Sequence, residues 1–244
     1  MILNKNNIFF LNFKKYIYFF FFTLLGKFLL LFKNKKDKKP IKDILIVGRG
    51  RSYRKILNDK LFLKRIDTIC LVNFGKKDGN KFAKNITDKN IIILTNKYEP
   101  ILNPKIILKL NIVKVIIDIL ERIENRNTFF SNIYGLPITK LPNNYKNLHN
   151  IKSTSLLKVI IFFIQKYRLK KLYICGLDFY SNDIFGKTYI GRNSGQLKTI
   201  LRIKGEHQKK FFFQILNKFS NVTFYIHSHA SLKNYRNLIK INKI

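Results

Sequence analysis

A glycine-rich turn in this chain combines the residue types of a phosphate site. Gly48, Arg49, Gly50 and Ser52 follow a short apolar run and precede a helix-like stretch. The two glycines allow close approach to the backbone, the start of the helix offers unpaired N–H groups, and Ser52 is a typical N-cap residue. We therefore expect a phosphate-binding turn. A glycine turn that serves packing alone is the competing interpretation.

The sequence around this turn disfavours two common nucleotide motifs. The dinucleotide fingerprint requires a third glycine where this chain has Tyr53, and an acid after the second strand where it has Asn73. A P-loop would close with Gly-Lys-Ser/Thr, and Gly50 is followed by Arg51 and Ser52 instead. An NAD enzyme and a P-loop nucleotidase are thus not indicated.

His207 is the strongest candidate for a general base. It lies in the sequence Lys-Gly-Glu-His at the apparent start of a helix, and histidine can exchange a proton near neutral pH. A surface histidine without a catalytic role is the alternative. His227 and His229 are spaced as a metal pair would be, but too few other ligands lie near them in the sequence, and we expect neither a metal nor another cofactor.

Asp178 and Tyr180 follow Gly176 at the end of a predicted strand. Asp178 is one of few acids in the second half of the chain, which indicates a hydrogen-bonding role in a cleft, and the Tyr180 hydroxyl can donate to a leaving oxyanion. The alternative is a turn with a capping Asp and a core Tyr. Cys70 and Cys175 lie inside apolar runs and are interpreted as small buried side chains of a reduced, cytoplasmic domain.

The elements that would position these residues alternate along the chain, which predicts a single α/β, Rossmann-like, doubly wound domain over residues 41–244 with a mainly parallel sheet. Short apolar runs predict strands at residues 43–47, 68–72, 91–95, 171–175 and 222–226. Helices are expected from residue 53 and at residues 106–123, 154–167, 206–219 and 231–241. Ligands of such sheets bind where the strands end, which adds Asn96 to the candidates.

Residues 1–40 differ from the rest. Residues 16–32 are apolar apart from Lys27, and lysines flank them on both sides. This length is marginal for a membrane-spanning helix, and a packing helix is the alternative. We expect a membrane-attached hydrophobic helix, with the main domain in the cytoplasm on the more positive side.

The net charge is +35, from 48 Lys and Arg against 13 Asp and Glu. Much of it belongs to a background rich in Lys, Asn, Ile and Phe, so the total charge does not indicate a nucleic-acid partner. From residue 184 onward Glu206 is the only acid among many bases, which favours an anionic ligand or an anionic membrane surface.

In order along the chain, these pieces resemble the bacterial sialyltransferases of glycosyltransferase family 42. The resemblance covers about residues 41–235 and is strongest from Ser153-Thr154-Ser155 to Asp178-Phe179-Tyr180. The family usually has Asn-Gly-Pro-Ser where this chain has Arg49-Gly50-Arg51-Ser52, and Arg where it has Lys152.

The resemblance implies metal-independent, inverting transfer of sialic acid, or a related nonulosonic acid, from a CMP-sugar to a glycan or glycolipid acceptor. His207 matches the general base and Tyr180 one of two tyrosines that assist the departing phosphate. The second would be Tyr189, with Phe185 in the competing alignment. The nucleotide-sugar would contact Gly48, Arg49, Gly50, Ser52, Asn73, Asn96, Thr154, Ser155, Gly176 and Asp178.

Two other classes of function stay open. One is the distantly similar glycine-turn family of flagellin-associated and pterin-kinase-like proteins. The other is a non-enzymatic basic protein that binds membrane or nucleic acid, whose affinity would fall steeply with salt and would not depend on His207, Ser52 or Tyr180.

Overall fold

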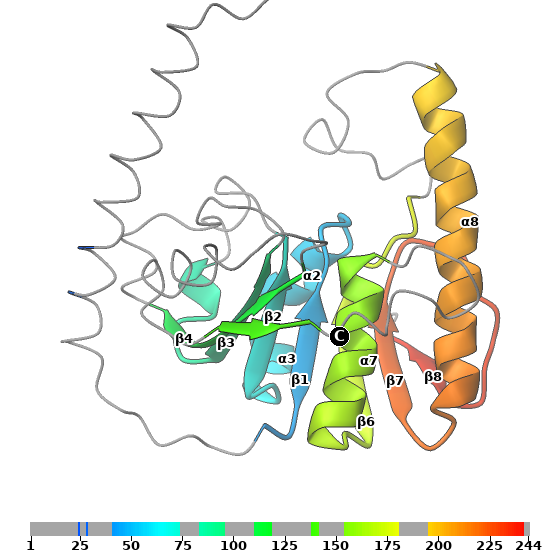
Figure 1. Ribbon diagram of the computed structural model, residues 1–244. Coiled ribbons are helices and arrows are strands. Elements are labelled where there is room, and N and C mark those ends of the chain that lie inside the picture. Colours follow the sequence, from blue (N-terminus) through cyan, green and yellow to red (C-terminus); the bar gives the residue numbers. More distant parts are fainter. Residues whose placement is uncertain are drawn as a thin grey trace, which may run out of the picture.

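A computed structural model describes residues 24, 28, 41–73, 83–95, 110–118, 138–141, 154–180 and 195–241. Within them, the chain forms one α/β domain (Figure 1). The predicted hydrophobic helix of residues 1–40 lies outside the described residues except for Leu24 and Phe28, which are helical and more than half exposed. Among the described helices, none combines the length and the apolar character that a bilayer crossing needs.

The described strands form one eight-stranded sheet in the order β5-β4-β3-β2-β1-β6-β7-β8. All neighbouring strands pair in parallel, so their carboxyl ends meet at one edge of the sheet. The α/β class and the parallel sheet that the sequence predicts are confirmed. The strands are β1 (Ile44–Val47), β2 (Thr68–Val72), β3 (Asn90–Thr95), β4 (Asn111–Ile117), β5 (Ile138–Lys140), β6 (Lys171–Cys175), β7 (Thr223–His227) and β8 (Leu238–Lys240).

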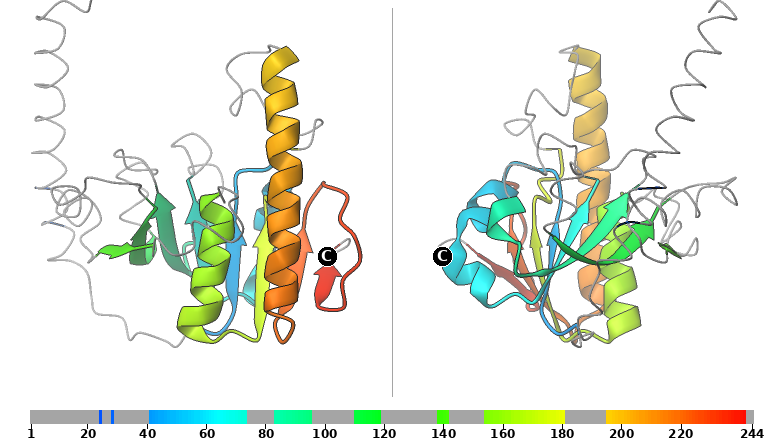
Figure 2. Two further views of the ribbon diagram at one scale, coloured as in Figure 1. Left: turned by 45° about the vertical axis from the view of Figure 1, so that its right-hand side comes forward. Right: turned by 90° about the vertical axis from the view of Figure 1, so that its left-hand side faces the viewer.

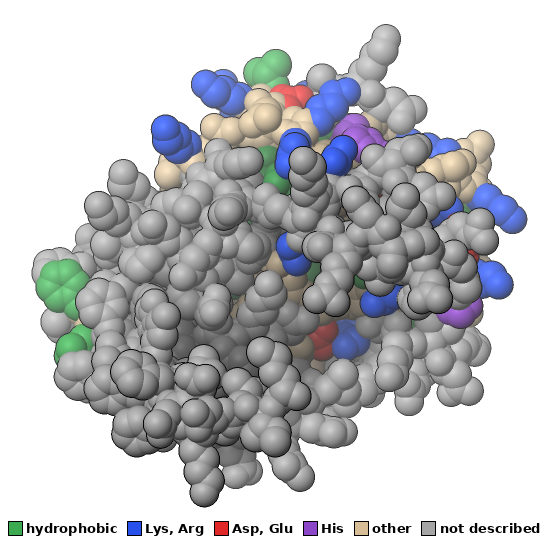
Figure 3. All heavy atoms as spheres, turned by 90° about the horizontal axis from the view of Figure 1, so that it is seen from above, with side chains coloured by type: hydrophobic (Ala, Val, Ile, Leu, Met, Phe, Trp, Pro, Cys, Tyr) green, Lys and Arg blue, Asp and Glu red, His purple; other side chains and the backbone are tan. Residues whose placement is uncertain are grey.

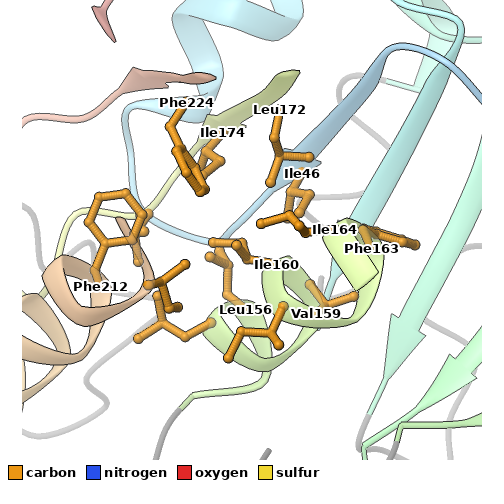
Figure 4. Close-up of a cluster of buried hydrophobic side chains, with 14 of the residues drawn as sticks. Ile46, Leu156, Val159, Ile160, Phe163, Ile164, Leu172, Ile174, Phe212 and Phe224 are labelled. Atoms are coloured by element: carbon orange, nitrogen blue, oxygen red, sulfur yellow. The ribbon is translucent and has the colours of Figure 1, made fainter. Parts of the chain in front are cut away.

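Helices cover both faces of the sheet, which is why its strands are apolar on both sides (Figure 2). The helices α7 (Ser155–Tyr167) and α8 (Gly195–Lys218) cover one face. There Ile46, Ile174 and Phe224 pack against apolar side chains of these helices (Figure 4). The helices α2 (Tyr53–Asn58) and α3 (Lys60–Lys64) cover the other face, where they pack on the alternate strand residues.

The order in which strands are added to the sheet reverses at β1. From β1 it runs outward through β2, β3, β4 and β5, and it then crosses to β6 on the other side of β1 and continues to β8. Strands β1 and β6 are therefore neighbours, far apart in the sequence, at the topological switch point. In open parallel sheets the crevice at this point is the usual ligand site.

The predicted helix at residues 106–123 is wrong. Residues 111–117 form strand β4, which pairs with β3 and β5. The run Ile112-Val113-Lys114-Val115-Ile116-Ile117 is mostly β-branched, and such side chains fit a pleated surface better than a helix. Strand β5 was not expected from the sequence.

The predicted helix at residues 231–241 is also wrong. The amide of Phe224 donates to the Asn237 carbonyl and that of Ile241 to the Ile226 carbonyl, so this segment follows the edge of the sheet and forms β8. The side chain of Asn237 donates to the carbonyls of Leu216 and Phe219, 3.0 and 3.1 Å away. It thereby satisfies carbonyls at the end of α8 that have no partner within the helix.

Helix α8 begins at Gly195, eleven residues before the predicted start at Glu206. A helix of its 24 residues is about 36 Å long, whereas a strand of the five residues of β6 spans about 17 Å. Its carboxyl-terminal part packs on the sheet, and its amino-terminal part projects beyond the carboxyl edge (Figure 1).

Candidate functional site

The loops that follow β1 and β6 are hydrogen-bonded to each other at the switch point. The Gly48 amide donates to the Cys175 carbonyl (2.8 Å) and the Gly50 amide to the Gly176 carbonyl (2.9 Å). In the reverse direction, the Gly176 amide donates to the Ser52 hydroxyl oxygen at 2.9 Å. The two loops thus continue the pairing of their strands past the edge of the sheet.

The glycines of these loops permit this close approach. A Cβ atom at Gly48 would overlap the Leu156 side chain and the Gly176 carbonyl, and one at Gly50 would overlap the Asp178 carboxylate. Gly176 also has a φ of +70°, which side chains disfavour. The glycines of the turn therefore serve packing between the two loops.

Asp178 joins three loops. Its side chain is buried, with 4% of the residue exposed. One carboxylate oxygen accepts from the Ser52 amide at 3.1 Å, and the other accepts from the His229 amide at 3.0 Å and the Ser228 hydroxyl at 3.3 Å. The Asp178 carboxylate thus binds the turn before α2 and the loop after β7. Neither residue was predicted as a partner of Asp178, because the amide of His229 leaves no sequence signal and the Ser228 hydroxyl belongs to a residue 50 positions away.

The predicted role of Ser52 as a helix cap is wrong. Ser52 precedes α2, but its side chain makes no capping hydrogen bond, and only 1% of the residue is exposed. Its hydroxyl oxygen instead accepts a hydrogen bond from the Gly176 amide, and its own amide donates to the Asp178 carboxylate. In the glycine turn, Arg49 and Gly50 are partly exposed and Arg51 is exposed.

The amino end of α7 brings together three of the predicted residues. Asn73 has a φ of +54°, a conformation that Asn tolerates, and its side-chain amide donates to the Ser155 hydroxyl oxygen at 3.2 Å. Thr154, the N-cap residue, makes no side-chain cap, and its amide donates to the Gln208 side-chain oxygen at 2.9 Å. The first turn of α7 contains no acid, and Asn73, Thr154 and Ser155 are partly exposed.

Tyr180 lies at the junction of β6 and α8. Phe179 and Tyr180 have positive φ values of +49° and +54°, which are uncommon for bulky residues. Residues with such backbone conformations are concentrated at functional sites in proteins. A Cβ atom at Gly205 would overlap the Phe179 carbonyl oxygen, so α8 touches the backbone of this loop there. The Lys204 ammonium lies over the Tyr180 ring, 5.4 Å from its centre, within range of a cation–π interaction.

The predicted position of His207 at the start of a helix is wrong, because His207 lies in the middle of α8. It is exposed, one turn after Lys204, and it precedes the buried Gln208. The structure therefore places His207 on the helix that contacts the Tyr180 loop and the amino end of α7. Asn96, Tyr189, Phe185 and Lys152 lie outside the described residues.

A buried ion pair fixes α7 beside the site. The Lys158 ammonium lies 2.8 Å from one carboxylate oxygen of Asp118, which follows β4. The side chains of both residues are nearly buried, at 9% and 12% exposure. The sequence did not predict this pair, because nothing in the apolar stretch around Lys158 indicates which acid it binds. The pair holds the first turns of α7 against the end of β4.

Both cysteines are buried, as predicted, and burial raises the pKa of the Cys70 and Cys175 thiols far above the ordinary range, so they stay protonated.

His227 is largely buried, with a ring nitrogen 2.7 Å from the Ile241 carbonyl oxygen. Its ring centre lies 6.1 Å from that of His229. In the described part of the chain, no three potential metal ligands cluster.

The carboxyl edge of the sheet, seen from above in Figure 3, carries many Lys and Arg side chains and few acids among the described residues. Arg51 and Lys204 are exposed on the two sides of the switch point, and the nearby Asp178 carboxylate is buried. The site thus presents positive charge to a ligand.

In the comparisons with known proteins, no family model, curated protein or solved structure matches this chain.

Proposed function

We propose that this protein is a glycosyltransferase that moves sialic acid, or a related nonulosonic acid, from a CMP-sugar to a glycan hydroxyl with inversion. One arrangement supports the proposal. Tyr180, the helix that carries His207, and the amino end of α7, whose N-cap residue makes no side-chain cap, meet at the carboxyl edge beside the switch point. A base, a hydroxyl donor and a set of phosphate-binding N–H groups are the components that such a transfer needs.

In this proposal the CMP phosphate binds at the amino end of α7. The first three amides of a helix have no partner within it, and the helix dipole favours an anion there. Asn73 and Ser155 are partly exposed polar side chains at this end, and the first turn holds no acid to compete with the phosphate. Arg49 and Gly50 of the neighbouring turn are the partly exposed residues that extend this surface.

The proposed reaction is a single displacement. A ring nitrogen of His207 takes the proton from the acceptor hydroxyl, and the acceptor oxygen forms a bond to the anomeric carbon of the sugar. The bond from that carbon to the phosphate oxygen breaks, and its electron pair goes to the phosphate. The Tyr180 hydroxyl donates a hydrogen bond to the departing oxygen, which stabilises the developing charge. No metal ion takes part in this scheme.

The test uses detergent-purified protein, CMP-sialic acid and a galactoside acceptor, with and without EDTA. Wild-type protein should form the sialylated product with EDTA present. His207→Ala should lower transfer by about 100-fold to 10,000-fold, as expected for loss of a general base, and should leave CMP binding unchanged. The matched control is His229→Ala, which removes an exposed ring at the same edge but keeps the amide that binds Asp178.

Absence of both CMP binding and CMP release in the wild type would remove this function, and loss of activity with EDTA would refute the metal-free reaction.

We also propose that residues 1–40 attach the domain to the cytoplasmic side of a membrane. Deletion of these residues should then release the protein from vesicles of zwitterionic lipid, to which the basic charge of the remaining domain is not attracted. Equal vesicle binding by the deleted form would argue against this attachment.

A further inference from the structure

Helix α8 is fixed to the rest of the site on both sides of His207. Two residues before it, Gly205 lies against the Phe179 carbonyl with no room for a side chain. One residue after it, Gln208 accepts a hydrogen bond from the Thr154 amide at 2.9 Å, and only 2% of Gln208 is exposed. Thr154 is the N-cap residue of α7. The two contacts tie the centre of α8 to the loop after β6 and to α7.

The contact from Gln208 replaces a capping interaction that α7 lacks. In a capping box, a Glu or Gln at the third helical position accepts from the amide of its own N-cap residue. The third helical position of α7 is Leu157, which is fully buried and has no acceptor. Gln208 supplies this acceptor from another helix. The bond therefore fixes how α8 is placed relative to the amino end of α7.

We propose that Gln208 is a positioning residue for His207, an assignment that rests on the proposed function. Adjacent residues of a helix differ by about 1.5 Å in height and 100° in direction, so a shift of Gln208 moves His207 with it. The donor phosphate sits at the end of α7 that Gln208 holds. The bond to Thr154 thereby sets the distance between the base and the donor, and misplacement by about 1 Å can lower a rate about 100-fold.

The experiment compares Gln208→Met with Ile215→Val in the full-length protein. Gln208→Met keeps the length of the side chain and removes the acceptor. Ile215→Val removes one methylene from the buried face of the same helix and leaves the bond to Thr154 intact. For each variant we would measure kcat and KM for the acceptor, the Kd for CMP, and the ratio of transfer to donor hydrolysis.

Gln208→Met should lower kcat for transfer about 10-fold to 100-fold, with KM for the acceptor and the Kd for CMP changed less than threefold. The ratio should shift toward hydrolysis, because donor cleavage is kept while the base is misplaced. Ile215→Val should match the wild type in all four quantities. Equal kinetics for the two variants, or equal loss in both, would overturn the assignment.

Exchange of the Thr154 amide hydrogen supplies a readout that needs no substrate. It should be faster in Gln208→Met than in the wild type and unchanged in Ile215→Val. A wild-type protein that neither binds nor cleaves CMP-sialic acid would overturn the proposed function and, with it, the role of Gln208 in catalysis. An active wild type with unchanged transfer in Gln208→Met would overturn the Gln208 assignment alone.

Discussion

The glycine turn after β1 and the amino end of α7 lie next to each other at the carboxyl edge, but they use their backbone amides in opposite ways. In the turn, the amides of Gly50 and Ser52 are taken by the Gly176 carbonyl and the Asp178 carboxylate. At α7, the N-cap makes no side-chain cap and the first turn holds no acid. The amides of Gly50 and Ser52 thus have partners within the protein, whereas the start of α7 is where we propose that the donor phosphate binds.

This difference shows that a glycine turn before a helix is not by itself an anion site. The start of α2 is a place where an anion is favoured, and the buried Asp178 carboxylate already occupies it. The glycines are needed because two loops approach closely, and phosphate binding is not required to explain them. Four predictions test the contrast between a closed turn and an open helix end.

The largest effect should come from Gly176→Ala. Gly176 has a φ of +70°, and its Cβ would overlap the Gly48 carbonyl. Backbone strain and overpacking together should lower the free energy of unfolding by about 2 to 5 kcal/mol. Urea unfolding measures this, and Arg51→Ala, an exposed change in the adjacent turn, should alter stability by less than about 0.5 kcal/mol. A stable Gly176→Ala protein would show that the loops are not closely packed.

Asp178→Asn should come next. Asn offers one acceptor oxygen and one NH2 group, so an N–H donor would face either the Ser52 amide or the His229 amide. We expect a loss of about 1 to 3 kcal/mol in unfolding free energy. Glu206→Gln is the control, because Glu206 is an exposed acid paired with Lys209 on the same helix. A neutral result for Asp178→Asn would mean that the turn closes without the carboxylate.

A pair of serine substitutions compares the two regions directly. Ser155→Ala should weaken CMP binding about fivefold to tenfold, which corresponds to one hydrogen bond of about 1 kcal/mol. Its effect on stability should be small, because Asn73, which loses its acceptor, is partly exposed and water replaces the hydroxyl. Ser52→Ala should lower the unfolding free energy by about 1 kcal/mol, because the buried Gly176 amide loses its acceptor, and should keep the Kd for CMP. Calorimetric titration and urea unfolding of both proteins measure these four quantities. The opposite pattern would place the ligand on the turn.

The smallest expected effect concerns Cys175, whose carbonyl accepts from Gly48 beneath the turn. Because burial raises the pKa of its thiol, the reactive thiolate is scarce at neutral pH and native protein should label slowly with a thiol reagent. Mass spectrometry should find the same slow rate with and without CMP, and a faster rate in Asp178→Asn. Protection of Cys175 by CMP alone would indicate that the nucleotide binds over the turn.

Much of the fold could be predicted because its signals are local. Strands β1, β2 and β3 are short apolar runs buried on both faces, and β6 and β7 are short apolar runs that are fully buried on one face; periodicity and length identify such runs. The errors arose where pairing partners decide the structure. Residues 111–117 and 238–240 are strands because neighbouring strands take their amides and carbonyls, and the sequence of each segment does not contain that partner.

The same limit applies to the site. The positions of Gly48, Asn73 and Gly176 at strand ends follow from the parallel sheet and could be predicted. The bonds from Asp178 to Ser52 and His229 and from Gln208 to Thr154 join residues that are 51 to 126 positions apart. Such contacts depend on how the loops and helices pack, so composition and spacing could identify Asp178 as unusual but could not identify what it binds.

Because α8 is continuous, the number of residues between His207 and the buried part of the helix determines where His207 lies. One uninterrupted helix joins His207 to Phe211 and Phe212, which are fully buried on the sheet. An insertion of one residue between Gln208 and Phe211 would rotate His207 by about 100° and raise it by about 1.5 Å relative to Phe211 and Phe212, and it would displace Gly205 and Gln208 from their partners. Insertions before Gly195 would leave this register intact. Changes in chain length should therefore be tolerated on one side of the candidate base and not on the other.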